Sequence, residues 1–169
     1  MKEQRCAKWI FSAVFSVALG LMSAIGQDLD ASKRAIDDFV KQAELKFESS
    51  KAGFVLKSKL AETFSYSMKG NDVEVLSVRY RNRDADHEEE YFFQAGKLVY
   101  ATERQAPVGG GGPDWSGVYY FKNGKLLDHA TNGHGKSELD SWDPEDEVFR
   151  MSRKRMKQLR DHLKKRNLR

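Results

Sequence analysis

The segment from Leu29 to about Ser50 carries apolar residues at the spacing of an α-helix. Steps of three, four or seven residues place side chains on one helix face, and charged residues fill the other positions. Asp28 or Asp30 can cap the start, and Gly53 lies where the helix is expected to end. The apolar positions of this predicted stripe are Leu29, Ile36, Val40, Ala43 and Phe47.

From Phe54 onward the apolar period changes to two, which is the period of a β-strand. Three glycine-containing turns separate the apolar runs. The turn at Asn123-Gly124 gives the strongest hairpin signal, because both central residues of such a turn need positive φ. The charged run 83–90 is expected to link two strands. The predicted strands cover residues 64–68, 73–81, 91–93, 98–102, 118–121 and 126–130.

Two of the predicted hairpins share one pattern. Tyr91-Phe-Phe-Gln-Ala-Gly-Lys-Leu and Tyr119-Tyr-Phe-Lys-Asn-Gly-Lys-Leu both follow Tyr-x-Phe-x-x-Gly-Lys-Leu. A repeat array needs at least about three matched units, so the pattern favours a meander over a solenoid. The hairpin resembles those of uncharacterised bacterial exported proteins with small α+β domains. The resemblance covers about residues 91–130 and implies neither an activity nor a functional residue.

Residues 143–169 are predicted to form a second helix. Asp143 can cap it, Pro144 suits the first helical position, and the acids that follow complement the helix dipole. The predicted fold class is therefore α+β: an N-terminal amphipathic helix packed on an antiparallel meander of about six strands, with a basic C-terminal helix. The narrow stripe of this last helix comprises Phe149, Ser152, Met156, Leu159 and Leu163.

The first 26 residues have the features of a secretory signal peptide. A basic N-terminus precedes the fourteen-residue apolar run 9–22, which carries no charge, and Ala24 and Gly26 are the small residues that signal peptidase requires. An uncleaved anchor is the weaker alternative, because the run is shorter than the roughly 18–20 residues that span a bilayer. We expect cleavage after Gly26, a periplasmic or secreted location, a single α+β domain over 27–142 and a charged helix over 143–169.

Loss of the signal peptide removes Cys6, the chain's only cysteine. The mature chain is then predicted to lack disulfides, a thiolate nucleophile and any cysteine-based zinc site. Charge is unevenly distributed, because residues 150–169 hold ten basic residues and a single acid, Asp161. Residues 27–149 hold sixteen basic and twenty-three acidic residues, a net charge of −7. An acidic body thus carries a basic tail.

The basic helix is the strongest functional candidate. A cationic helix with an apolar stripe can associate with an anionic membrane surface or an acidic polymer. The competing interpretation is that Met156 and Leu159 pack on the sheet while the charges face solvent. Nucleic acid is disfavoured as a partner, because export separates the chain from it and no binding motif accompanies the charge.

Many aromatic residues fall on the predicted strands. On one sheet face they would form a core against the N-terminal helix, whereas an exposed aromatic strip would suit a peptide or a glycan. The candidate binding residues are Trp115, Tyr119 and His129 on the hairpins, and Arg153, Lys157 and Arg160 on the basic helix.

Metal and phosphate chemistry find little support. One cluster of ligand-type side chains lacks the spacing of a zinc site or a calcium loop. The glycines of 109–112 are followed by Pro113 and Asp114 rather than by a helix, which favours a flexible connection over a phosphate loop. No metal and no cofactor is predicted. The ligand-type cluster comprises Asp128, His129, His134, Glu138 and Asp140.

No nucleophile–base motif of a familiar hydrolase class occurs, although Glu74, Glu89 and Glu90 lie on strands and can pair in a cleft. The leading hypothesis is an exported, non-catalytic domain that binds a protein, peptide or envelope polymer through an open sheet face. The first alternative is a small hydrolase that uses carboxylates or His129. The second is a protein that docks on a membrane surface through its basic helix. The sequence predicts no oligomeric state.

Overall fold

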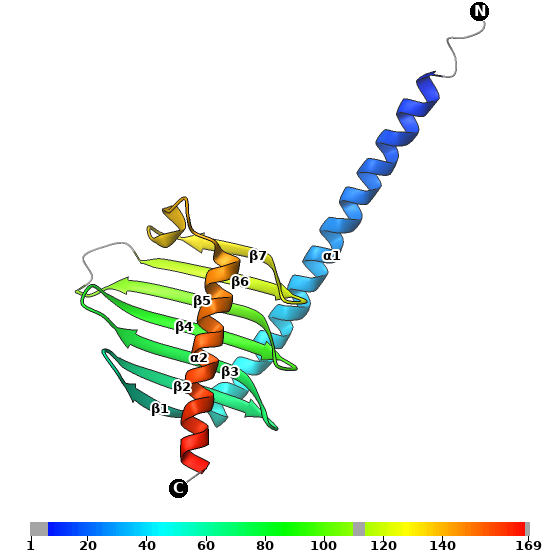
Figure 1. Ribbon diagram of the computed structural model, residues 1–169. Helices are drawn as coiled ribbons and strands as arrows, with labels where there is room; N and C mark the ends of the chain where they lie inside the picture. Colours follow the sequence, from blue (N-terminus) through cyan, green and yellow to red (C-terminus); the bar gives the residue numbers. More distant parts are fainter. Residues whose placement is uncertain (1–6, 110–113, 168–169) are drawn as a thin grey trace, which may run out of the picture. The chain divides into compact units, whose positions relative to one another are not determined.

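The computed structural model describes residues 7–109 and 114–167, and the side chains of residues 28–109 and 114–166 (Figure 1). Helix α1 spans Ala7–Ser50 and helix α2 spans Pro144–Asn167. A single turn of 3-10 helix, η1, covers Lys136–Glu138. The strands between the helices are β1 (Ala52–Lys57), β2 (Ala61–Lys69), β3 (Asp72–Arg81), β4 (Ala85–Gln94), β5 (Lys97–Pro107), β6 (Trp115–Lys122) and β7 (Lys125–Asn132).

The chain divides into two compact units, which meet within α1. The first unit ends at Asp37 and contains the predicted signal peptide, of which residues 1–6 lie outside the described part. The second unit, residues 38–169, contains the end of α1, the sheet and α2. Among the described residues, no helix has both the length and the apolar character needed to cross a bilayer. The signal peptide and its cleavage after Gly26 stay predictions.

The seven strands form one antiparallel meander in the order β1 to β7. This confirms the α+β fold class, with one strand more than the sequence indicated, because β1 pairs with β2. The expected charged link at 83–90 is wrong, since most of it belongs to β4. Two of its acids are accommodated by arginines on the neighbouring strand: Arg81 binds Asp86, and Arg79 binds Glu88. Opposite charges across a strand pair stabilise a sheet.

Helix α2 lies across one face of the sheet, from β7 toward β1 (Figure 1). It begins at Pro144 as predicted, and the Asp143 carboxylate accepts a hydrogen bond from the Asp146 amide at 3.0 Å. The core is continuous from the sheet into this helix. Its buried members are Phe64, Tyr66, Val73, Leu76, Val78, Tyr91, Phe93, Leu98, Ala101, Tyr119, Phe121, Val148 and Leu159.

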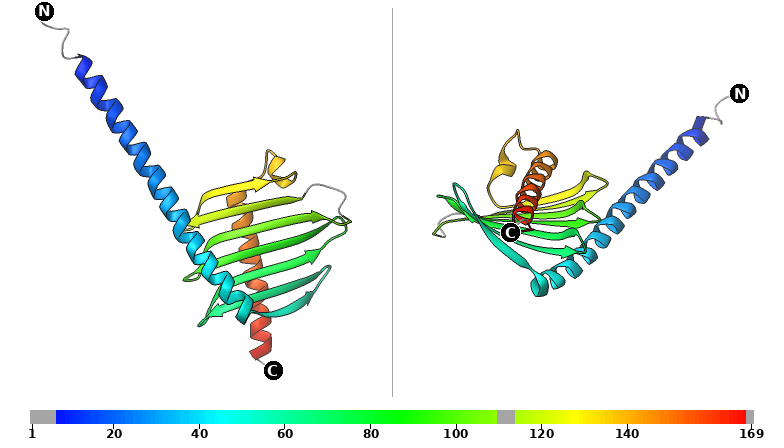
Figure 2. Two further views of the ribbon diagram at one scale, coloured as in Figure 1. Left: turned by 180° about the vertical axis from the view of Figure 1, so that it is seen from behind. Right: turned by 60° about the horizontal axis from the view of Figure 1, so that its bottom comes forward.

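Residues 38–50 of α1 lie over the opposite face of the sheet (Figure 2). Val40, Ala43 and Phe47 are buried there, as the predicted stripe requires, and so are Val75 and Phe92 of that sheet face. The strand aromatics were expected to pack against the N-terminal helix. Most of them instead pack with α2, because the alternation of β2, β4 and β6 turns them to the other face.

The buried face of α2 differs from the predicted stripe. Val148, Ser152, Arg155 and Leu159 recur at steps of four, three and four and are the buried residues of this helix. Phe149, Met156 and Leu163 flank them and are only partly buried. Leu159 and Met156 therefore pack on the sheet, as the competing interpretation held, but one of the ten basic residues is part of the interior.

Candidate functional site

The face of the sheet beneath α2 changes character along the strands. Near the turn at Gly96 this face is apolar, with Phe93 and Leu98, and further along the same two strands it becomes acidic. Glu89 on β4 and Glu103 on β5 are direct neighbours across the strand pair, and both are buried. Like charges placed opposite each other destabilise a sheet. The rest of the fold must therefore compensate these two carboxylates.

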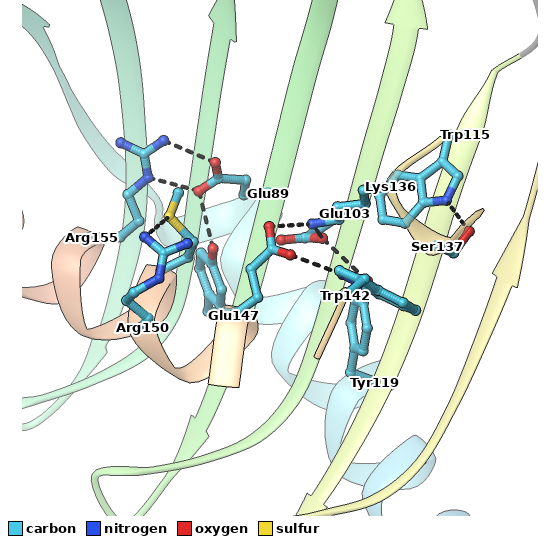
Figure 3. Close-up of polar contacts among 12 residues, drawn as sticks. Glu89, Glu103, Trp115, Tyr119, Lys136, Ser137, Trp142, Glu147, Arg150 and Arg155 are labelled. Carbon is cyan, nitrogen blue, oxygen red and sulfur yellow. Dashed lines mark hydrogen bonds and ion pairs between the residues drawn. The ribbon is translucent and has the colours of Figure 1, made fainter. Parts of the chain in front are cut away.

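Arg155 compensates Glu89 (Figure 3) and also a third buried acid, Glu62 on β2. The guanidinium is 1% exposed and binds Glu89 with two hydrogen bonds, Nε to Oε2 at 2.7 Å and Nη2 to Oε1 at 2.9 Å. Its Nη1 donates to Glu62 Oε1 at 2.7 Å. The planar fork of arginine matches a carboxylate in this paired geometry. Gln158 of α2 also binds Glu62.

Lys136 compensates Glu103 in the same way (Figure 3). Its ammonium donates to Glu103 and, at 2.9 Å, to Glu147 on the first turns of α2. Trp142 Nε1–H donates to the other oxygen of Glu147 at 2.8 Å. One lysine of η1 thus connects the sheet to α2, and the segment between β7 and α2 is held over the acidic end of the face.

Two tyrosines complete the environment of the acids. Tyr91 Oη–H donates to Glu89, and Tyr119 Oη–H donates to Glu103 at 3.2 Å. Gly117 makes the second contact possible, because a Cβ at this position would lie 2.8 Å from Cζ of Tyr119. Burial raises the pKa of Glu103, and the nearby Lys136 ammonium opposes that rise.

A cavity of about 160 Å³ opens beside this network, on the side of α2 that faces the β3–β4 and β5–β6 connections. The Tyr80 and His87 rings stack in its wall with centroids 4.6 Å apart. Burial lowers the pKa of His87, which favours a neutral ring. Asn82 Oδ1 accepts hydrogen bonds from the Asp84 and Ala85 amides, so Nδ2 is the atom that faces His87 and it donates. In the neutral ring, His87 Nε2 therefore accepts this hydrogen bond and the proton lies on Nδ1. Glu89, Glu103 and Glu147 converge on this cavity.

A larger groove of about 490 Å³ lies on the other side of α2, beside the β4–β5 turn. Its floor is apolar and comes from the sheet and from the flank of the helix. Its rim is formed by basic side chains of α2, which are exposed, with Asp161 as the acid among the lining residues. The floor residues are Phe93, Leu98, Phe149 and Met156, and the rim residues are Arg153, Lys157, Arg160 and Lys164.

The structure does not bring the six predicted binding residues together in one site. Arg153, Lys157 and Arg160 all line the groove. Trp115 and Tyr119 are buried, so they cannot belong to an exposed aromatic strip. Trp115 nevertheless forms part of the cavity wall, beneath the Lys136 ammonium at 4.8 Å from the ring centroid.

His129 lies on β7, as predicted, and its side chain is exposed. Its ring contacts Tyr119 and Trp142, with centroid distances of 6.3 Å and 5.8 Å. Within residues 7–109 and 114–167, no group of three or more His, Cys, Asp or Glu is arranged to hold a metal ion. Within the ligand-type cluster, His134 contacts Glu138 through Nδ1. The glycine-rich connection lies largely outside the described residues, since 110–113 are not among them.

The sequence analysis did not find Arg155, Lys136 or Glu103 as partners. Arg155 carried a usable signal, because it lies three and four residues from Ser152 and Leu159 and so shares their helix face. Glu89 was recognised as a strand carboxylate that can pair in a cleft, and the structure places it there. Nothing local to Lys136 indicates that it binds two acids on different elements.

The described part of the chain thus defines an α+β protein with a seven-stranded antiparallel sheet and a helix on each face. Comparison with protein-family models, with curated proteins and with solved structures finds no match for the chain. The function must therefore be argued from the cavity and the groove themselves.

The replacement Glu103→Gln is expected to alter how stability depends on pH. The pKa of Glu103 is raised above the ordinary 4.5, so the folded protein holds this proton more tightly than the unfolded chain. The resulting stability is present below about pH 4.5 and is lost as pH rises through the folded pKa. The free energy of unfolding of the variant, relative to wild type, should therefore increase with pH. Urea unfolding between pH 4 and 8 measures this difference. Glu48→Gln, an exposed control, should show no such trend.

Proposed function

We propose that this protein is an exported binding module that takes an anionic, partly apolar partner into the groove between α2 and the β4–β5 turn. The observation that carries this proposal is the combination of an apolar floor with four basic side chains along one flank of α2. Apolar surface supplies affinity when it is buried, and a basic rim attracts and orients a negatively charged partner. The volume is within the usual range of ligand clefts.

The groove is favoured over the open sheet face that the sequence suggested. Each face of the sheet carries a helix, and Trp115 and Tyr119 are buried. On the α1 side, the part of the sheet near Arg79 and Arg81 presents arginines that are already paired with acids of β4. The rim cations Arg153, Lys157 and Arg160 are exposed on a rigid helix and line a hollow.

The alternative, a small enzyme, is supported by the convergence of Glu89, Glu103 and Glu147 on the cavity and by the raised pKa of Glu103. All three carboxylates, however, accept hydrogen bonds from cations of the fold itself, Arg155 or Lys136. Such pairing is what a structural network requires. The carboxylates therefore favour a role in holding α2 on the sheet, and the binding function remains our proposal.

The test uses 1-anilinonaphthalene-8-sulfonate, an aromatic sulfonate that combines negative charge with apolar surface. Wild-type protein should enhance its fluorescence in a saturable, salt-sensitive manner. Lys157→Glu/Arg160→Glu should raise the Kd by about tenfold, equivalent to about 1.4 kcal/mol. Lys154→Glu/Lys165→Glu makes the same change of charge on the same helix at exposed positions that do not line the groove, and should leave the Kd within about twofold.

Circular dichroism and urea unfolding of all three proteins would establish that the variants are folded. Equal affinity in wild type and in the Lys157→Glu/Arg160→Glu variant would contradict the proposal. So would a loss of affinity that is the same in the two charge-reversed variants, because net charge rather than the groove would then explain binding.

A further inference from the structure

We infer that the partner segment is an amphipathic α-helix with acidic residues along one flank, lying in the groove alongside α2. This inference rests on the proposed function, since it names the occupant of the same groove. A helix that places its apolar face into a hydrophobic groove is one of the recurring modes of peptide recognition. The features that select a helix here are the spacing of the rim charges, the spacing of the floor residues and the concave shape of the groove.

The rim cations recur with the period of a helix. Arg153, Lys157, Arg160 and Lys164 follow steps of four, three and four residues. At about 1.5 Å of rise per residue, they extend along about 16.5 Å, with successive cations about 4.5 or 6 Å apart. Acids at positions i, i+4, i+7 and i+11 of a partner helix repeat at the same axial distance, so every pair can form at once. An extended peptide repeats its same-side residues at about 6.6 Å, and over three intervals it falls out of step.

The floor has a matching period. Phe149 and Met156 are seven residues apart on α2, which is about 10.5 Å or two helical turns. Phe93 and Leu98 supply the opposite side from the β4–β5 hairpin. Apolar residues of a partner helix at i, i+3 or i+4, and i+7 cover the same length and can pack on both sides of this floor.

The turn end of the hairpin leaves the groove open. Gly96 lies there in a left-handed conformation, with φ of 74°, and a Cβ at this position would meet no atom within 4 Å. A segment that passes over this turn would therefore meet no atom close to Gly96.

An anionic membrane fits these observations less well. A flat surface can reach the rim cations, but it cannot follow the concave floor of the groove. Among the described residues, none of the large apolar side chains that are exposed belongs to α2; they are Leu45, Val55, Leu60, Met68, Val108 and Leu139. A helix that binds at a bilayer interface needs an exposed apolar face. The apolar flank of α2 instead faces the groove and the core.

The test uses the full chain and fluorescently labelled synthetic peptides. The first is a capped peptide of twenty-one residues with leucine on one helical face and glutamate along one flank of that face. The second has the same composition in a scrambled order that removes the apolar face but keeps the charge. Fluorescence anisotropy should give a Kd for the amphipathic peptide at least tenfold below that of the scrambled peptide. Lys157→Glu/Arg160→Glu should weaken the amphipathic peptide by tenfold or more, and Lys154→Glu/Lys165→Glu by less than about twofold.

Further measurements separate the possible outcomes. Equal binding of the two peptides, or binding of neither while the sulfonate probe still depends on Lys157 and Arg160, would overturn the helix inference and leave the proposed function standing. The protein could instead sediment with phosphatidylglycerol vesicles, lose this property in Lys157→Glu/Arg160→Glu and bind no peptide. The occupant of the groove would then be a lipid surface rather than a helix. A concentration-dependent dimer that Lys157→Glu/Arg160→Glu abolishes, again without peptide binding, would replace it by a second copy of this chain. If Lys157→Glu/Arg160→Glu changes the binding of neither the sulfonate probe, the peptides nor the vesicles, the proposed function itself fails.

Discussion

Replacement of Arg155 by methionine is expected to lower the free energy of unfolding by about 3–5 kcal/mol. The side chain is almost completely buried, and its removal leaves Glu89 and Glu62 inside the core without their cation. An uncompensated buried charge costs far more than the net contribution of the intact ion pair. Methionine keeps the length and most of the apolar volume of the arginine stem, so the loss would report on charge rather than on packing. Urea unfolding at pH 7 measures it.

Arg153→Met is the matched control, since it changes the same residue type on an exposed part of the same helix and should stay within about 0.5 kcal/mol of wild type. Adding Glu62→Gln and Glu89→Gln to Arg155→Met should recover a large part of the loss, because no buried charge then lacks its partner. An Arg155→Met protein as stable as the Arg153→Met control would show that the carboxylates are hydrated or paired in another way.

Leu159→Ala is expected to destabilise the protein by about 2–5 kcal/mol. Leu159 is fully buried in the core that joins α2 to the sheet, so its truncation removes apolar contacts and leaves a cavity. Chemical unfolding of the full chain measures the change. The prediction matters because the C-terminal helix could be expected from its charge to be a separate tail, whereas the structure makes it part of the core.

Leu45→Ala provides the same substitution at a site that is 70% exposed, and there the effect should remain within about 0.5 kcal/mol. If Leu159→Ala were as mild as Leu45→Ala, the packing of α2 on the sheet would not contribute to stability. The groove would then lack a rigid wall, and the binding proposal would lose its geometric basis.

The ion pairs at the acidic end of the sheet hold α2, and α2 in turn positions the basic rim of the groove. Arg155 and Lys136 bind α2 and η1 to carboxylates of β2, β4 and β5. These contacts fix the helix along one line on the sheet, and the rim residues follow from that line because they occupy the flank of the same helix. The buried ion pairs thus join α2 and η1 to three strands of the sheet, and in some folds buried polar groups of this kind are retained because they define a register.

Local sequence patterns predicted most of the secondary structure. The strand alternation, the Asn123-Gly124 turn and the Asp143-Pro144 helix start all depend on neighbouring residues, and all three are confirmed. The charged run of β4 was misassigned for the opposite reason. Its strand propensity is weak by itself, and the arginines that make it favourable come from β3, which only the register of the sheet places alongside it.

In the candidate site, too, features of one continuous segment were predicted and features that combine distant segments were not. The basic residues Arg153, Lys157 and Arg160 were identified from charge and helical spacing, which are properties of one continuous segment. The apolar floor beneath them was not, because Phe93 and Leu98 reach the groove only after the hairpin has paired and α2 has docked. The choice between an exposed aromatic strip and a core for Trp115 and Tyr119 could not be made locally either, since burial depends on what packs above a strand.

Local periodicity and charge were sufficient to predict the α+β class, the start of the second helix and the basic character of its surface. Which face of each strand is covered, which acids are buried and which cation compensates each of them follow only from the folded arrangement of distant segments. Arg155 lies 66 residues from Glu89 and 93 from Glu62 along the chain. Whether a charge can be buried depends on the field of groups that distant segments bring to it, and no local pattern contains that information.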